Sequence, residues 1–346
     1  MDNIVQIRKK IKETAVRQGW WNSRKILVAL SGGGDSVALL WLLNKFYNGK
    51  IIAAHLDHMT RNGESHLDAL FAKKICEEWG IDFVSKTVDI EKNCIKGESF
   101  EMAARRVRYE FFNEIARKNE IDFISIGHSA DDLIETQIMN LFRGTGILGL
   151  RGIPETRDNI IRPIIDFRRE ELRDILRSNN IEWREDYTNK ETVYTRNKIR
   201  EELFPWIKQN LNPNFEISLI GLAKEIDAET KEKLEKAEKN LSSVNIEIKP
   251  AIATWDAKLL KRFSDNELKQ MIRLQGKKLN LPVLSRKKTD ILCALIKKEG
   301  CWRFQWACDI EVCYSLRGIG WLHRHNVEES IKKEKNKKEI LPWWAI

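Results

Sequence analysis

Ile26-Leu27-Val28-Ala29-Leu30 and the adjoining Ser31-Gly32-Gly33-Gly34-Asp35-Ser36 decide the fold of this chain. Five consecutive apolar residues are typical of a strand that is covered on both faces of a sheet. In residues 37–46 the apolar side chains follow too densely for a surface helix, so we expect a buried helix there. The sequence therefore predicts a strand, a tight glycine turn and a helix in direct succession.

The same alternation continues over the next hundred residues. Strands are predicted at residues 51–56, 82–86 and 123–126, and helices at residues 67–79, 99–118 and 131–142. Strands that alternate with helices are typical of an α/β fold with a doubly wound parallel sheet. Such sheets bind ligands where their strands end, so we expect the functional residues to follow the strands.

Charge divides the rest of the chain. We expect an α/β domain over residues 1–208, a helical connector over 209–250, and a small basic α+β domain over 251–346. The formal net charge is +9, and residues 251–346 account for all of it with 20 basic and 11 acidic side chains. A basic module beside a neutral one indicates binding to a polyanion, although a lysine-rich soluble surface would give the same number of charged residues.

Several protein classes are excluded by composition. The longest apolar run, residues 37–43, is far shorter than the roughly 20 residues of a membrane-spanning helix. The first residues show no apolar signal-peptide core, so we expect a cytoplasmic protein, a monomer or homodimer, with no membrane partner. Six cysteines without a Cys-x-x-Cys spacing speak against a zinc or iron–sulfur site.

The glycine loop, residues 31–36, predicts a phosphate site. Its glycines let backbone N–H groups approach a phosphate, and the following helix adds the positive end of its dipole. The hydroxyl groups of Ser31 and Ser36 can donate to phosphate oxygens. Asp35 is a poor phosphate contact, so we expect it to hold Mg²⁺ against the phosphates. The lysine of a kinase-type loop is missing, and a dinucleotide loop would need Gly or Ala in place of Val37.

Ser31-Gly32-Gly33-x-Asp35-Ser36 after a first strand resembles the signature of the pyrophosphate-loop (PP-loop) ATPases. The resemblance implies an adenine nucleotide alpha-hydrolase-like fold. It also implies that ATP is split into AMP and pyrophosphate to activate a carbonyl-like oxygen. The nucleotide would lie on Ser31, Gly32, Gly33, Gly34, Asp35 and Ser36.

Further segments resemble the tRNA(Ile)-lysidine synthases within that superfamily. They are residues 55–61, 101–109, 127–136, 143–152, 162–163 and 196–200, together with Asp186, Thr188 and Asn189. The similarity spans about residues 24–208. It departs at Asp68, where the family usually has Glu, and at Ser129, where a second His is common. Longer members often continue past a segment like Pro342-Trp343, so we expect an abbreviated last module.

This resemblance implies a two-step ligation that uses Mg²⁺ and ATP. The wobble cytidine of an isoleucine tRNA with a CAU anticodon would first be adenylated at its carbon 2 oxygen. Free L-lysine would then displace AMP and form lysidine, which changes codon reading from AUG to AUA. The basic module at residues 251–346 would bind the tRNA.

The residues after the second strand offer one set of contacts. His55 and Asp57 lie beside the expected position of the adenosine, so we expect them to contact the nucleotide. Zinc binding and a purely structural cluster are the alternatives, and no matching Cys/His pair supports zinc.

Acidic residues gather after the fourth strand. Helical spacing allows Asp131, Asp132 and Glu135 to share one face, where they would repel one another unless a cation joins them. Mg²⁺ or the ammonium group of lysine would suit, and a capping box between Ser129 and Asp132 is a structural alternative. We expect catalytic roles for these carboxylates, for Asp35 and for His128.

Arginines form the last group of candidates. We expect Arg105, Arg108, Arg143, Arg196 and Arg200 to bind ATP, pyrophosphate or RNA phosphate, although Arg105 and Arg108 could instead belong to a solvated helix face paired to Glu101 and Glu110. Arg169, Arg173 and Arg177 form an i, i+4 stripe that could follow an RNA backbone or simply face water.

Three other functions share parts of this pattern. A PP-loop tRNA thiolase would need catalytic or cluster-binding cysteines. An ammonia-using synthetase would share the glycine loop but would not need a basic terminal module. An RNA-binding protein with a vestigial nucleotide site would not need Asp35 in an intact loop.

Overall fold

A computed structural model describes residues 2–59, 64–95, 97–185, 195–298, 300–307, 309–315 and 318–333. Arg61, Asp186, Thr188, Asn189 and the Pro342-Trp343 segment lie outside the described residues. The chain forms two compact units, residues 1–227 and 228–346. In the part of the chain that the structure describes, no helix is long and apolar enough to cross a membrane.

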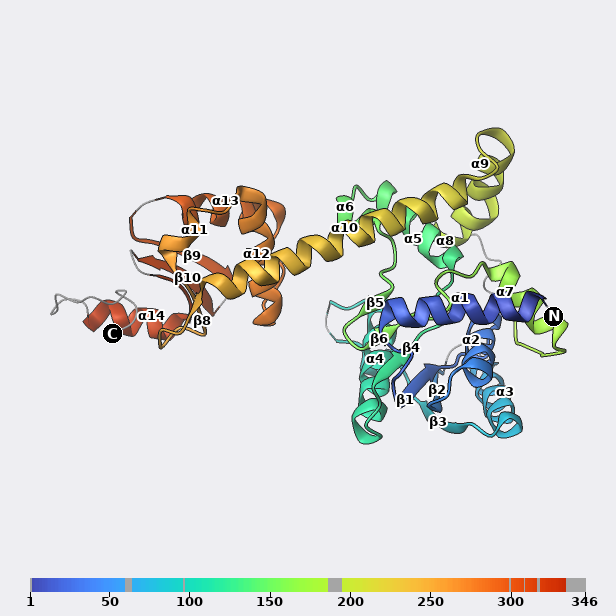
Figure 1. Cartoon of the computed structure of the whole chain (residues 1–346). Helices are drawn as coiled ribbons and strands as arrows, with labels where there is room; N and C mark the ends of the chain where they lie inside the picture. The colour runs from blue at the N-terminus through green and yellow to red at the C-terminus, as the bar shows by residue number, and fades with distance from the viewer. Residues whose placement is uncertain are drawn as a thin grey trace. The chain divides into compact units, whose positions relative to one another are not determined.

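The first unit contains a six-stranded sheet of order β3-β2-β1-β4-β6-β5 (Figure 1). Its parallel strands are β1 (Lys25–Ala29), β2 (Lys50–Asp57), β3 (Asp82–Thr87), β4 (Phe123–Ser125) and β6 (Ile160–Ile161). The short β5 (Thr156–Arg157) pairs antiparallel with β6 at the edge. The predicted doubly wound parallel sheet is therefore confirmed, with one antiparallel edge strand in addition.

Helices cover both faces of this sheet. Along β1, Ile26 and Val28 pack into one core and Leu27 into the other, as expected for a strand covered on both sides. The first core is closed by α1 (Asp2–Gln18), α2 (Gly34–Phe46), α3 (Glu64–Trp79) and α7 (Arg169–Ser178). The second is closed by α4 (Phe100–Lys118), which follows a 3-10 turn at Glu91–Asn93.

The buried face of α2 confirms the expectation drawn from its composition. Val37, Leu39, Leu40 and Leu43 are fully buried, because this helix lies between the sheet and the helices of the first core. α1 was not predicted, although Ile7 and Ile11 mark its apolar stripe at a spacing of four residues.

A second group of helices packs beside the sheet. It comprises α5 (Ala130–Phe142), α6 (Ile147–Leu150), α8 (Thr195–Lys198), a π-helical turn (Ile199–Leu203), α9 (Phe204–Asn210) and the first part of α10 (Phe215–Val244). Ile134, Ile138, Phe204 and Phe215 form their shared core. The boundary between the two units falls within α10.

The second unit is built on a five-stranded antiparallel sheet of order β7-β8-β11-β10-β9. Its strands are β7 (Asn245–Ile246), β8 (Ala253–Trp255), β9 (Trp302–Ala307), β10 (Ile310–Ser315) and β11 (Gly318–His323). Its helices are α11 (Ala257–Leu260), α12 (Asp265–Lys278), α13 (Arg286–Lys297) and α14 (Arg324–Lys333). Trp255 and Trp321 are fully buried in its core, so they serve packing, and an α+β module at the basic end is confirmed.

Candidate active site

A cavity of about 1130 Å³ lies at the carboxyl ends of β1, β2 and β4. Strand order reverses at β1, and parallel sheets bind ligands at such a point. Among the predicted residues, the cavity is lined by Ser31, Gly33, Gly34, Asp35, Ser36, His55, Asp57, Arg105, Arg108, His128, Asp132, Glu135, Arg196 and Arg200. Gly32, Asp131 and Arg143 do not line it. Most of the predicted residues therefore meet in one cavity, whose volume is large enough for a nucleotide and a second group.

The glycine loop keeps its shape through its own polar groups. The Ser36 hydroxyl donates to the carbonyl oxygen of Gly33 at 2.9 Å, and its oxygen accepts from the backbone N–H of Ser31 at 3.2 Å. Gly32 has a φ of +91°, a left-handed conformation that favours glycine. Because α2 begins at Gly34, the N–H groups of its first turn have no partner within the helix, and its positive end meets the cavity.

A segment that the sequence analysis missed lies against this loop. The backbone N–H of Arg184 donates to the carbonyl oxygen of Gly32 at 3.0 Å, and the Arg184 guanidinium pairs with Asp68 on α3. A Cβ atom at Gly34 would lie 3.3 Å from the Trp183 ring, so glycine allows this close approach. Residues 183 and 184 thereby support the loop from the cavity side.

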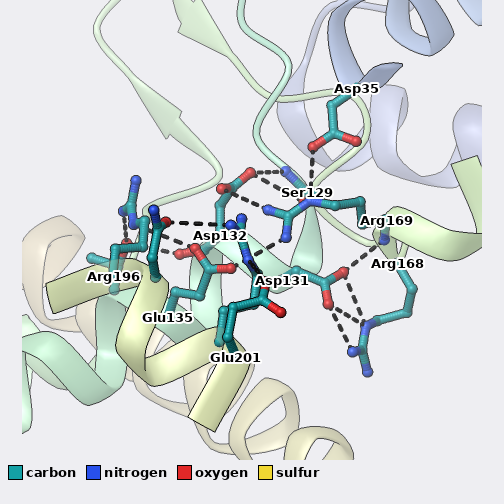
Figure 2. A network of polar contacts seen from close by, with 12 residues as sticks. Asp35, Ser129, Asp131, Asp132, Glu135, Arg168, Arg169, Arg196 and Glu201 are labelled. Carbon is teal, nitrogen blue, oxygen red and sulfur yellow. Dashed lines mark hydrogen bonds and ion pairs between the residues drawn. The ribbon is translucent and has the colours of Figure 1, made fainter. Parts of the chain in front are cut away.

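The centre of the site is an arginine surrounded by three carboxylates (Figure 2). Arg169 places Nε 3.4 Å from an Asp35 oxygen, one terminal nitrogen 3.3 Å from Asp132, and the other 3.3 Å from Glu135. Its guanidinium is the cation that the sequence analysis required, but it comes from the chain itself. The alternative that Arg169 simply faces water is wrong, because the side chain turns into the cavity, and its contact with an RNA backbone stays a prediction.

Burial governs the protonation of these carboxylates. It raises the pKa of Asp35 to about 6; Arg169 opposes this rise and the charge of Asp132 adds to it. Burial also raises the pKa of Glu135, against the charges of Arg169 and Arg196. A cation that enters the site would favour the ionised forms of both groups.

Asp131 faces away from this group. Its carboxylate accepts from the Arg168 guanidinium at 2.8 Å and from the backbone N–H of Arg169 at 2.6 Å. Burial alone would raise the pKa of Asp131, but these hydrogen bonds lower it. The expectation that three acids share one face therefore holds only for Asp132 and Glu135. Asp131 acts as a clamp between the starts of α5 and α7, because α7 begins at Arg169.

Asp132 performs two tasks. One oxygen accepts from the backbone N–H of Ser129 at 2.9 Å, which confirms the predicted capping box. The other oxygen faces Arg169. The cap therefore fixes the Asp132 carboxylate in the cavity.

Two histidines, His55 and His128, also line the cavity. The Nδ1 atom of His128 accepts a hydrogen bond from Arg162 Nε at 2.9 Å, so the ring is neutral with its hydrogen on Nε2. Burial lowers the pKa of His128 to about 4, against the charge of Asp132. The Nδ1 atom of His55 donates to the carbonyl oxygen of Leu30 at 2.8 Å, and burial lowers the pKa of this ring also.

The predicted arginines take different positions. Arg105 lies over the Tyr109 ring at 4.9 Å, and Arg108 contacts His58 Nε2 at 3.1 Å. Arg196 on α8 places its Nε atom 3.3 Å from a Glu135 oxygen. Arg143 lies at the end of α5 and does not line the cavity. Of the two acids considered as partners of Arg105 and Arg108, Glu110 pairs instead with Arg106, which also pairs with Glu98.

A preformed cage for a metal ion is not present among the described residues, where no group of three His, Cys, Asp or Glu side chains could hold one. Mg²⁺ usually binds through one or two carboxylates and the phosphates of the substrate, so Asp35 beside the glycine loop fits that mode.

Comparison with known proteins adds the family. A model of the PP-loop domain matches residues 3–207, more than half of the chain. The chain belongs to the PP-loop domain family. In this PP-loop protein the glycine loop, the strand order and the cavity all fall within the matched residues.

Curated relatives share this part of the PP-loop protein. The tRNA(Ile)-lysidine synthase of Clostridioides difficile (strain 630) is 44% identical over 210 residues, which are 59% of this chain and 46% of that protein. The protein of the same name from Thermotoga maritima is 42% identical over 201 residues, 57% of this chain and 48% of the relative. The chain spans about half the length of these curated relatives.

A solved structure shows the same fold. The U34-tRNA thiolase NcsA from Methanococcus maripaludis, with its [4Fe-4S] cluster, matches with a TM-score of 0.53 and 21% identity. The match covers 65% of this chain and 78% of the thiolase. At this identity the likeness concerns the fold alone.

The pKa of His128 can be measured directly. We expect its imidazole to stay neutral from pH 8 down to about pH 5 and to take up a proton near pH 4, whereas an exposed histidine titrates near about 6.5. Nitrogen-15 NMR of the ring would report this, with His128→Asn to assign the signal. Titration of His128 between pH 6 and 7 would contradict the buried, Arg162-bonded ring.

Replacement of Arg169 by Gln should destabilise the first unit in a pH-dependent way. Asp35, Asp132 and Glu135 would lose their shared cation, a loss that costs up to about 3–5 kcal/mol for buried ion pairs. Without Arg169, burial and repulsion raise the pKa of Asp35 and of Glu135 further above the values in the unfolded chain, so stability returns as the pH falls and one of these carboxyls takes up a proton. Thermal unfolding at pH 7.5 and 5.5 would measure both effects.

Arg173→Gln is the matched control. Arg173 lies one turn further along α7, and its ion pair with Glu170 is exposed and 3.8 Å long, so this change should shift stability little. Equal stability of the two variants at pH 7.5 would show that Arg169 does not neutralise the acidic group.

Proposed function

We propose that this protein joins L-lysine to carbon 2 of the wobble cytidine in an isoleucine tRNA with a CAU anticodon, at the expense of ATP. The observation that carries the proposal is a single cavity in which a glycine loop, the carboxylates of Asp35, Asp132 and Glu135, and several arginines meet. The tRNA(Ile)-lysidine synthases that share 44% and 42% identity with this chain support it, because their similarity covers about 200 residues.

ATP would bind with its phosphates on the glycine loop. The N–H groups at the start of α2 would receive the phosphate oxygens, and His55 and Asp57 at the end of β2 would contact the nucleoside. Mg²⁺ would be held by Asp35, where it would neutralise charge on the phosphates. The arginines of the cavity would stabilise the pyrophosphate as it leaves.

Two bond changes complete the reaction. The carbon 2 oxygen of cytidine attacks the α-phosphate of ATP, and pyrophosphate leaves. The amine of lysine then attacks carbon 2, the carbon–oxygen bond to AMP breaks, and the nitrogen loses a proton. Asp132 and Glu135 would attract the ammonium group of the incoming lysine, and the neutral His128 ring lines the same cavity.

The basic second unit would bind tRNA. Residues 251–346 carry the entire net charge of +9, and of the tryptophans described there Trp255, Trp306 and Trp321 are buried and Trp302 is partly buried. Phosphate contacts would therefore dominate this grip. An unstacked anticodon base would be inexpensive to place in the cavity.

A thiolase reading has less support. Sulfur transfer on this fold would need a reactive or cluster-binding cysteine at the nucleotide, and no cysteine lines the cavity among the described residues.

The experiment incubates the protein with labelled lysine, Mg·ATP and either of two isoleucine tRNA transcripts, with a CAU or a UAU anticodon. We expect label in the CAU transcript only, together with AMP and pyrophosphate. Asp35→Asn should lose at least 100-fold in rate, because Mg²⁺ and phosphate lose their anchor.

Asp174→Asn is the matched control, since Asp174 is exposed on α7 and pairs only locally with Arg177. It should retain the activity of the unaltered protein. Absence of label from both transcripts would refute the proposal, and label in the UAU transcript would refute the wobble-cytidine assignment.

A further inference from the structure

The basic side chains of the cavity are of one kind. All seven Lys or Arg residues among its described lining residues are arginines. The chain as a whole contains more lysine than arginine, 35 against 25. In residues 1–227, which contain the cavity, the two residue types are nearly balanced at 19 arginines and 16 lysines, yet the described lining contains arginine alone.

One lysine close to the cavity in the sequence shows how lysine is kept out of the lining. Lys198 lies between Arg196 and Arg200 in the sequence, and both arginines line the cavity. Lys198 itself is exposed and is not a lining residue. The only primary amine in this short stretch is thus turned away from the site.

Charge alone does not account for arginine at each position. Arg196 contacts a Glu135 oxygen at 3.3 Å and the Thr136 hydroxyl at 3.0 Å, both on α5. A lysine ammonium could satisfy a carboxylate there as well, since it carries the same charge and three donors. The two side chains differ in chemistry, because a guanidinium stays protonated while an amine can lose its proton and become a nucleophile.

The environment of the cavity would promote the loss of a proton from a lysine amine placed there. Burial lowers the pKa of Arg108, and the neighbouring Arg105 acts in the same direction. A lysine in such a place would carry a larger neutral fraction than one in water, because burial and like charges both disfavour the ammonium form. A tethered amine would also be present at a high effective concentration.

We infer that the arginine-only lining in the described part of the cavity is a specificity device: it presents no side-chain amine there that could compete with free lysine for the activated base. This inference rests on the proposed function. If a lysine side chain stood in the cavity, its Nζ would attack carbon 2 of the adenylated cytidine, AMP would leave with the oxygen, and Nζ would lose a proton. The product would be a covalent bond between protein and tRNA. The cavity histidines would give only a cationic adduct, which water or an amine displaces.

The test introduces one amine at a time. Arg196→Lys, Arg105→Lys and Arg200→Lys each keep the charge and place an amine on the cavity wall. Each is incubated with Mg·ATP and the CAU transcript without lysine. Pyrophosphate release reports activation of the base, and a denaturing gel with mass spectrometry of the cross-linked peptide reports the adduct.

We expect at least one of these variants, Arg105→Lys first because its amine would lie near the Arg108 guanidinium, to form at least ten times more adduct than the unaltered protein. Free lysine should suppress the adduct by competition. Arg157→Lys, on β5 outside the cavity lining, is the matched control and should form none.

Two outcomes would overturn the inference. The first is pyrophosphate release without an adduct above background in every variant that activates the base. The second is loss of pyrophosphate release in all three, because guanidinium geometry would then explain the arginines. Failure of the proposed function is distinguished separately, since the unaltered protein would then fail to ligate labelled lysine to the CAU transcript.

Discussion

The guanidinium of Arg169 meets Asp35 from α2 and Asp132 and Glu135 from α5, and the arrangement of the cavity depends on that contact. Three carboxylates at the end of a sheet repel one another unless a cation lies between them. Arg169 supplies it from the first turn of α7, where its backbone N–H is already held by Asp131. One residue therefore joins three helices at the point where the sheet ends.

The glycine loop depends on this arrangement too. It is anchored from β1, held internally by Ser36, and supported by the backbone of Arg184. Asp35 belongs to the glycine loop and also pairs with Arg169, so the phosphate site and the acidic group share this residue. A nucleotide on the loop and an amine near Glu135 would thus meet within a single cavity, as a two-step ligation requires.

Sequence reasoning anticipated a large part of the fold and of the site. The strands and helices predicted over residues 26–142 begin and end within a few residues of the observed positions, because apolar runs and their spacing are local properties, whereas α1, β5 and β6 were not predicted. Fourteen of the predicted residues line the cavity, since the ends of parallel strands lie at one edge. Arg143 and Asp131 do not, because helical spacing gives a face but not the partner that captures a side chain.

The sequence by itself determined the glycine loop, the parallel sheet and the basic terminal module, because each depends on neighbouring residues or on composition. Only the tertiary structure decided that Arg169 turns inward, that Trp183 and Arg184 lie on the loop, and that Lys198 faces away while Arg196 and Arg200 face in. Those outcomes depend on contacts between segments more than a hundred residues apart or on the rotation of a short helix, and residue spacing along the chain does not fix either of them.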